Sequence, residues 1–149
     1  MSSFTNLIKT SPEFAVPRAY LIACCCDIEN LSQDIIYSLF NANKCNYLFE
    51  FIKRKNFEGE LNFKWKNPCF KKFLNLFGEN FHNMVMIEVE KELDKNILED
   101  SFETIRANRG SIAHENSTIS LTVEEIKVCY ENCMKALSIT KEYVDNLPS

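Results

Sequence analysis

The chain is predicted to fold as an all-α bundle of five to six helices. Apolar residues recur at three- and four-residue steps over most of its length, which is the period of helices with one buried face. The 149 residues include only 3 Gly and 4 Pro, which are few turn signals for an all-β protein. This length suits a single domain, and no repeat or linker is visible. We therefore expect an N-terminal lead-in over residues 1–17 and one helical domain over residues 18–149.

The first helix is expected over residues 18–40, because Pro12 and Pro17 argue against a long helix through the lead-in. A second helix is expected over residues 44–55, with its own apolar face. The apolar positions that predict the first helix are Leu21, Ile22, Cys25, Ile28, Leu31, Ile35 and Leu39.

Residues 56–67 are the least helical stretch, and their alternating apolar and polar residues predict a short extended segment. A helix is expected from Pro68, which suits a first helical position, to Phe77, with Gly78 ending it. Two further helices are expected over residues 81–94 and from about residue 98 into the segment near residue 109.

The last helix has the clearest predicted start. Thr122 followed by Glu125 forms a capping box, in which each side chain satisfies a backbone amide at the helix N-terminus. One buried stripe is expected to follow, made of Val123, Ile126, Tyr130, Cys133, Leu137 and Val144.

Charge is unevenly distributed along the chain. The net charge is −4, yet residues 44–72 hold eight Lys and Arg against three Glu, a local charge of +5. Aromatic residues interleave these cations, as in proteins that bind single-stranded RNA, although aromatic residues at helical spacing are usually buried in a core. The candidate RNA-binding residues are Lys53, Arg54, Lys55, Lys64 and Lys66.

Seven cysteines raise the question of disulfides or a metal site. Their number is odd, three are consecutive, Cys129 and Cys133 stand four positions apart on a predicted helix, and there is no CxxC pair and no His within normal ligand spacing of them. We interpret them as reduced, small hydrophobic residues, with no metal and no cofactor expected. The sequence also has no long apolar run and no secretory pattern at its start, so no membrane contact and a cytoplasmic location are expected.

The segment from Arg109 to His114 reads RGSIAH and is the strongest clue to function. Arginine offers a fork of donors suited to phosphate, and histidine moves protons near neutral pH. An arginine that binds the phosphate and a histidine that transfers protons are the smallest set of side chains that could cleave RNA without a metal. On a regular helix the two side chains would stand roughly 140° apart. Because glycine is a poor helix former, a bend at Gly110–Ser111 is expected to turn both into one cleft.

This segment resembles the Rx4–6H motif of the HEPN superfamily, in which Ile-Ala also precedes the histidine. Residues 18–31 look like that superfamily's long early helix with an acidic residue in its middle, and residues 121–126 look like the start of its last helix. The similarity in layout covers about residues 18–140, and the RiboL-PSP type is the suggested branch.

The resemblance implies a metal-independent endoribonuclease acting as a homodimer, in which two Arg–His motifs share one cleft. It implies that Arg109 holds the phosphate and that His114 is the general acid or base. RNA would be the substrate and would leave a 2′,3′-cyclic phosphate and a 5′-hydroxyl. Such families commonly serve as toxins or phage-defence effectors, so an antitoxin or defence-system partner protein is also expected.

Three further residues are supporting candidates. Glu29 lies near the apolar stripe of the first helix, and a buried carboxylate needs a cationic partner such as Arg109 or His114; an exposed carboxylate fits equally well. Ser111 and Asn116 are candidate substrate donors or local caps. His82, the other histidine, is interpreted as a structural or surface residue.

Two departures from the family pattern keep an alternative open. Gly110 stands where a polar residue is common, and Glu115 stands where the family often has glycine. The carboxylate of Glu115 would repel a phosphate. The alternative is a non-catalytic HEPN-like module that binds nucleotide, RNA or a protein.

Overall fold

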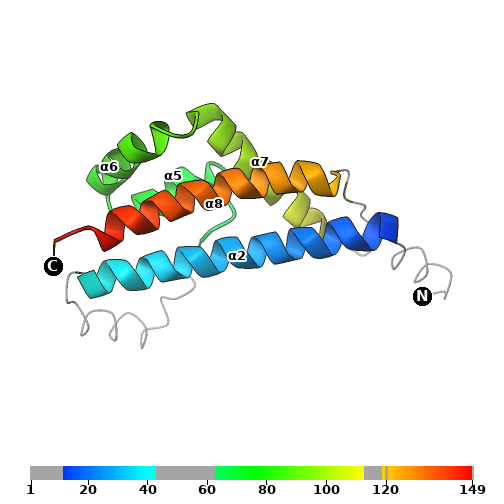
Figure 1. The fold of residues 1–149 in the computed structure, drawn as a ribbon, viewed down its shortest axis with the longest axis horizontal. Helices are drawn as coiled ribbons and strands as arrows, with labels where there is room; N and C mark the ends of the chain where they lie inside the picture. Colours follow the sequence, from blue (N-terminus) through cyan, green and yellow to red (C-terminus); the bar gives the residue numbers. More distant parts are fainter. Residues whose placement is uncertain (1–11, 43–62, 113–118, 120, 149) are drawn as a thin grey trace.

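The computed structural model describes residues 12–42, 63–112, 119 and 121–148, and this part of the chain is an all-α fold with five helices (Figure 1). The predicted fold class is confirmed. The helix expected over residues 44–55 lies outside the described residues, as does most of the extended segment expected over residues 56–67. Residues 63–66 of that segment are outside any helix, as expected.

The first described helix, α2, spans Pro12–Ala42 and begins six residues before the predicted start at Arg18. The expectation that the two prolines would exclude a helix here was wrong. Pro12 occupies the first helical position, where its missing N–H would have no partner in any case. Pro17 lies inside the helix. It removes only one backbone hydrogen bond, which the long packed face that follows it outweighs.

Helix α2 lies alongside α8, which spans Val123–Asp145, and this pair forms the most extensive helix contact among the described elements (Figure 1). Helix α7, Lys95–Ile112, packs against both. Side chains from these three helices are fully buried between them: Leu21, Ile28 and Ile35 of α2, Leu98, Phe102 and Ile105 of α7, and Ile126, Leu137 and Val144 of α8. This three-helix core fixes the position of α7 relative to the middle of α2.

Two shorter helices complete the described fold. Helix α5 spans Cys69–Asn75 and follows Pro68, and α6 spans Glu79–Glu90. Gly78 lies between the two helices, but it is the N-cap of α6 and not the residue that ends α5; its φ of 102° is one that glycine adopts readily. Helix α5 ends two residues before the predicted Phe77, in a turn whose amides bond back to its last carbonyls.

The aromatic residues of the basic stretch are partly accounted for by the core. Phe63, Phe70 and Phe73 are buried, and Phe63 and Phe70 each stack on Phe102 of α7 with ring centroids 5.5 and 5.4 Å apart. These rings therefore anchor α5 and the segment before it to α7, and they are unavailable to an RNA base. Trp65 is only half-buried.

The predicted start of the last helix is confirmed. Thr122 is the N-cap of α8, and its hydroxyl accepts a hydrogen bond of 3.2 Å from the backbone N–H of Glu125. Of the predicted stripe, Ile126, Cys133, Leu137 and Val144 are buried, whereas Val123 and Tyr130 are half-buried.

The cysteines behave as small hydrophobic residues. Cys24, Cys25, Cys69 and Cys133 are buried in the core, and none of the six described cysteines is in a disulfide. Burial raises the pKa of Cys24 and Cys69 to about 11, so these thiols stay neutral at physiological pH. Among the described helices, none is both long and apolar enough to cross a membrane.

Candidate active site

Arg109 lies in the last turn of α7, and its side chain is half-exposed, at 44% of its surface. The helix continues through Gly110 and ends at Ile112, so the bend expected at Gly110–Ser111 does not form. Glycine within a helix costs only about 1 kcal/mol relative to alanine. The buried residues Phe102 and Ile105 on the preceding turns hold the helix against the core and outweigh that cost.

Glu29 approaches Arg109 from the middle of α2. Its Oε1 lies 3.5 Å from Nη2 of Arg109, and its side chain is 42% exposed. The carboxylate is therefore not the buried one considered from the sequence. Its cationic neighbour is nevertheless Arg109, one of the two partners expected for it. This contact joins residues 80 positions apart in the chain.

Trp65 completes a three-residue cluster with Glu29 and Arg109. Its indole N–H donates to the same Oε1 of Glu29 at 2.7 Å, and the Cζ of Arg109 lies 5.4 Å from the ring centroid. Such a distance allows a favourable interaction between a guanidinium and an aromatic face. The Glu29–Trp65–Arg109 cluster thus draws on α2, α7 and the segment before α5.

Sequence reasoning did not single out Trp65, which was only one of several aromatic residues in the basic stretch. Two signals set it apart. It is the one tryptophan of the chain, and its polar neighbours Lys64 and Lys66 are both exposed.

The remaining predicted site residues are only partly described. Ser111 belongs to α7, but its side chain is not described. The other members of the predicted site and of the RNA-binding set lie outside the described residues: His114, Asn116, Lys53, Arg54 and Lys55. Cys25, one turn before Glu29, is also near Arg109. Burial raises the pKa of its thiol to about 12, and the charge of Arg109 acts in the opposite direction.

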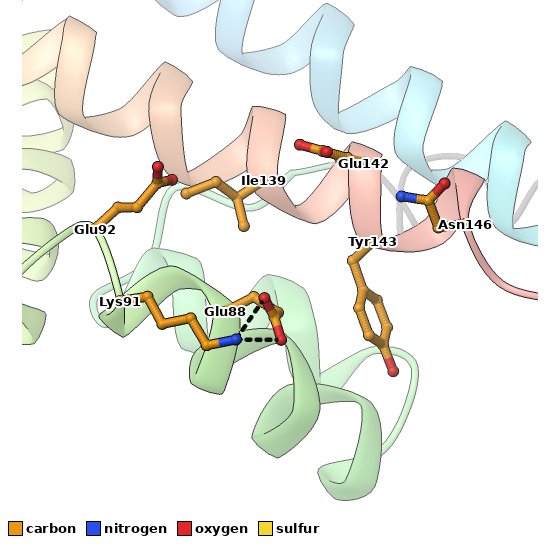
Figure 2. Close-up of a pocket in the computed structure, with 7 residues that line it drawn as sticks. All are labelled: Glu88, Lys91, Glu92, Ile139, Glu142, Tyr143 and Asn146. Atoms are coloured by element: carbon orange, nitrogen blue, oxygen red, sulfur yellow. Dashed lines mark hydrogen bonds and ion pairs between the residues drawn. The ribbon is translucent and has the colours of Figure 1, made fainter.

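A cavity of about 450 Å³ lies between α6 and α8 (Figure 2), and its lining includes no member of the Glu29–Trp65–Arg109 cluster. Three carboxylates and one lysine give its lining a negative charge, which would repel a phosphate. The lysine, Lys91, is paired with Glu88 at 3.0 Å. The lining residues are Glu88, Lys91, Glu92, Ile139, Glu142, Tyr143 and Asn146.

A second cavity, of about 410 Å³, includes His82, Lys71 and Glu79 in its lining. His82 is half-buried, and its Nδ1 lies 3.1 Å from the side-chain oxygen of the adjacent Asn83. His82 is therefore a residue of the surface, remote from Arg109 in its contacts, as expected from the sequence.

An all-α bundle that presents an arginine at the end of an inner helix, five positions before a histidine, defines the HEPN class of proteins. The RiboL-PSP-HEPN family model matches residues 2–146, nearly the whole chain. The chain belongs to this family, which confirms the resemblance and the suggested branch. Membership suggests a ribonuclease-like or nucleotide-binding module. Searches of curated proteins and of solved structures found no match.

Proposed function

We propose that the protein is a metal-independent endoribonuclease that cleaves RNA by attack of the 2′-hydroxyl. The observation that carries the proposal is the setting of Arg109. Its guanidinium lies against Trp65, has one long contact with Glu29 and is half-exposed, five positions before His114. An arginine held in this way has donors left over for a phosphate.

The chemistry needs only these two residue types and the RNA itself. A base removes the proton of the 2′-hydroxyl, whose oxygen attacks the adjacent phosphorus. The bond from phosphorus to the 5′-oxygen breaks, and an acid returns a proton to that oxygen. His114 fills the base or acid role, and Arg109 stabilises the charge on the non-bridging oxygens. The products are a 2′,3′-cyclic phosphate and a 5′-hydroxyl.

Because one histidine cannot be base and acid in the same step, we propose a homodimer in which two copies supply both. The exposed face of α2 beside Glu29 supports this, since it carries small or apolar uncharged side chains: Ala19, Ile22, Ala23, Cys26 and Asn30. Ile22→Glu is expected to give a monomer without activity. The matched change at exposed Val128 of α8, Val128→Glu, is expected to leave the dimer intact.

The decisive test is RNA cleavage by the purified protein in EDTA. We expect single-stranded RNA to be cut with the cyclic-phosphate product, and a DNA of the same sequence to stay intact because it lacks the nucleophile. His114→Ala should abolish cleavage, and His82→Ala should leave it unchanged. Cleavage that requires a divalent metal, or that survives His114→Ala, would contradict the proposal.

One observation favours a second candidate, an RNA- or nucleotide-binding module without catalysis. A carboxylate, Glu29, already stands at Arg109, and a second, Glu115, follows the histidine. Two carboxylates near the phosphate would weaken catalysis more than binding. RNA binding with no cyclic-phosphate product, equal in wild type and His114→Ala, would establish this candidate instead.

In the cell we propose a toxin or phage-defence role in the cytoplasm, with an antitoxin or defence-system protein as partner. Family membership supports this setting. Expression of the wild-type protein should arrest growth of a bacterial host, and His114→Ala should relieve the arrest. Normal growth on expression of active enzyme would contradict it.

A further inference from the structure

Trp65 makes the shortest polar contact of the Glu29–Trp65–Arg109 cluster. Its indole N–H to Oε1 of Glu29 spans 2.7 Å, whereas the Arg109 Nη2 contact with that same oxygen spans 3.5 Å. Hydrogen bonds to a carboxylate are strong at about 2.7–2.9 Å and weak at the longer distance. The orientation of Glu29 is therefore set mainly by Trp65 and only secondarily by Arg109.

The indole ring of Trp65 also packs against the buried core. Phe63 meets the Trp65 ring edge-on, with centroids 4.9 Å apart, and Phe63 is buried against Phe73 and Phe102. Because Phe102 belongs to α7, the helix that carries Arg109 also carries the support of the ring on which Arg109 rests. The ring position is thus fixed relative to the guanidinium without any substrate.

Another pair on α7 shows a glutamate that pairs with an arginine through both carboxylate oxygens. Glu103 accepts hydrogen bonds from Arg106 through both of its oxygens, one from Nε at 2.7 Å and one from Nη2. This is the usual two-bond pairing of a guanidinium with a carboxylate. It occupies the same fork of donors that a phosphate would use.

We propose that Trp65 is a positioning residue that keeps Glu29 from closing on Arg109 in this two-bond manner, so that the fork of Arg109 stays open to an RNA phosphate. The indole N–H holds one carboxylate oxygen, and the ring face supports the guanidinium. Without the N–H, Glu29 is free to pair fully with Arg109 and to compete with the phosphate. The inference rests on the proposed function for its ligand, RNA, but not for catalysis.

The test is a binding cycle with a fluorescently labelled, single-stranded 2′-O-methyl RNA, which the protein cannot cleave because the nucleophile is blocked. Trp65→Phe retains a ring and removes the N–H. We expect it to weaken binding roughly tenfold, because the phosphate must then displace an additional charge-assisted hydrogen bond between Glu29 and Arg109. Adding Glu29→Gln should restore binding to the wild-type level or better, because the competing charge is gone.

A matched control removes a carboxylate elsewhere. Trp65→Phe combined with Glu103→Gln changes the net charge equally but should bind as weakly as Trp65→Phe alone. Circular dichroism checks that each variant is folded. Trp65→Leu, which has no hydrogen-bond donor in its side chain, replaces Trp65→Phe if that variant unfolds, with the same expected rescue.

The outcomes separate this inference from the proposed function. Unchanged binding by Trp65→Phe, or a loss that Glu29→Gln does not rescue, overturns the positioning role while leaving the ribonuclease proposal standing. Binding and rescue without cleavage of ordinary RNA support the positioning role and overturn catalysis. A wild-type protein that does not bind the RNA overturns both.

Discussion

Arg106 and Arg109 stand three residues apart on the same helix, yet their surroundings differ. Arg106 makes two hydrogen bonds to Glu103 of its own helix. Arg109 makes one long contact with Glu29 of α2 and rests against Trp65. The first pair is local, follows from the spacing of three in a helix, and occupies the Nε and Nη2 donors of the guanidinium. The second is made by three separate segments and leaves the guanidinium half-exposed.

An arginine on this helix is therefore not by itself a phosphate site. Arg106 and Arg109 carry the same charge and lie on successive turns, so net charge does not distinguish them. The difference is the carboxylate geometry: Glu103 pairs with Arg106 through both of its oxygens, whereas Glu29 is held by an indole. We therefore expect only Arg109 to act in binding and cleavage.

Replacing each arginine in turn is expected to give the largest difference in RNA cleavage. Arg109→Ala should lower kcat/KM for single-stranded RNA by about 100-fold or more, the usual loss when one donor to a developing oxyanion is removed. Arg106→Ala should stay within about twofold, because its charge is already neutralised by Glu103. Initial rates in EDTA measure both variants. Equal losses in the two would show that the motif attracts RNA through charge alone.

A smaller effect tests the helix that carries both arginines. Gly110 is exposed, and a Cβ added to it would meet no atom within 4 Å. Gly110→Ala should therefore raise the free energy of unfolding by about 0.5–1 kcal/mol, because alanine loses less backbone entropy in a helix. Urea unfolding followed by circular dichroism measures it. A loss of stability would mean that residue 110 needs a conformation which alanine resists.

The smallest expected effects concern Glu103 and Glu99, two carboxylates one turn apart on α7. Their pKa values are shifted in opposite directions. Hydrogen bonding to Arg106 lowers the pKa of Glu103 below 4.5, so its stabilisation is present above that pH and disappears as the pH falls through the lowered value. Burial raises the pKa of Glu99 above 4.5, and one of its oxygens is buried without a hydrogen-bond partner among the described residues. Stability is therefore lost as the pH rises from 4.5 through that raised value.

At pH 7, Glu103→Gln should lower the free energy of unfolding by about 0.3–0.5 kcal/mol, the usual contribution of such an exposed helical pair. Glu99→Gln should raise it, and both differences should shrink toward zero well below pH 4.5. Thermal unfolding at several pH values measures the two variants beside wild type. The same sign of change in both at pH 7 would contradict the assignment of their surroundings.

Local signals in the sequence predicted much of the fold. The capping residues Thr122 and Glu125 act over three positions, and the start of α8 follows from them. The predictions that were wrong relied on the local preference of one residue, which the packing of the helix overrides. Pro17 and Gly110 disfavour a helix locally, yet both lie inside helices that bury apolar residues such as Leu21 of α2 and Ile105 of α7. A preference of a few kcal/mol at one residue yields to apolar burial along the whole helix.

Periodicity, capping and a six-residue motif are properties of neighbouring residues, so the all-α class, the family and Arg109 as the phosphate-binding candidate could be predicted from the sequence. The surroundings of Arg109 could not, because they depend on the packing of distant segments. Trp65 lies 36 positions from Glu29, and Glu29 lies 80 from Arg109. These residues meet only because α2 and α7 pack on α8 and because Phe63 anchors the Trp65 segment to Phe102. No local sequence pattern predicts these contacts, since they depend on how all the helices of the core pack together.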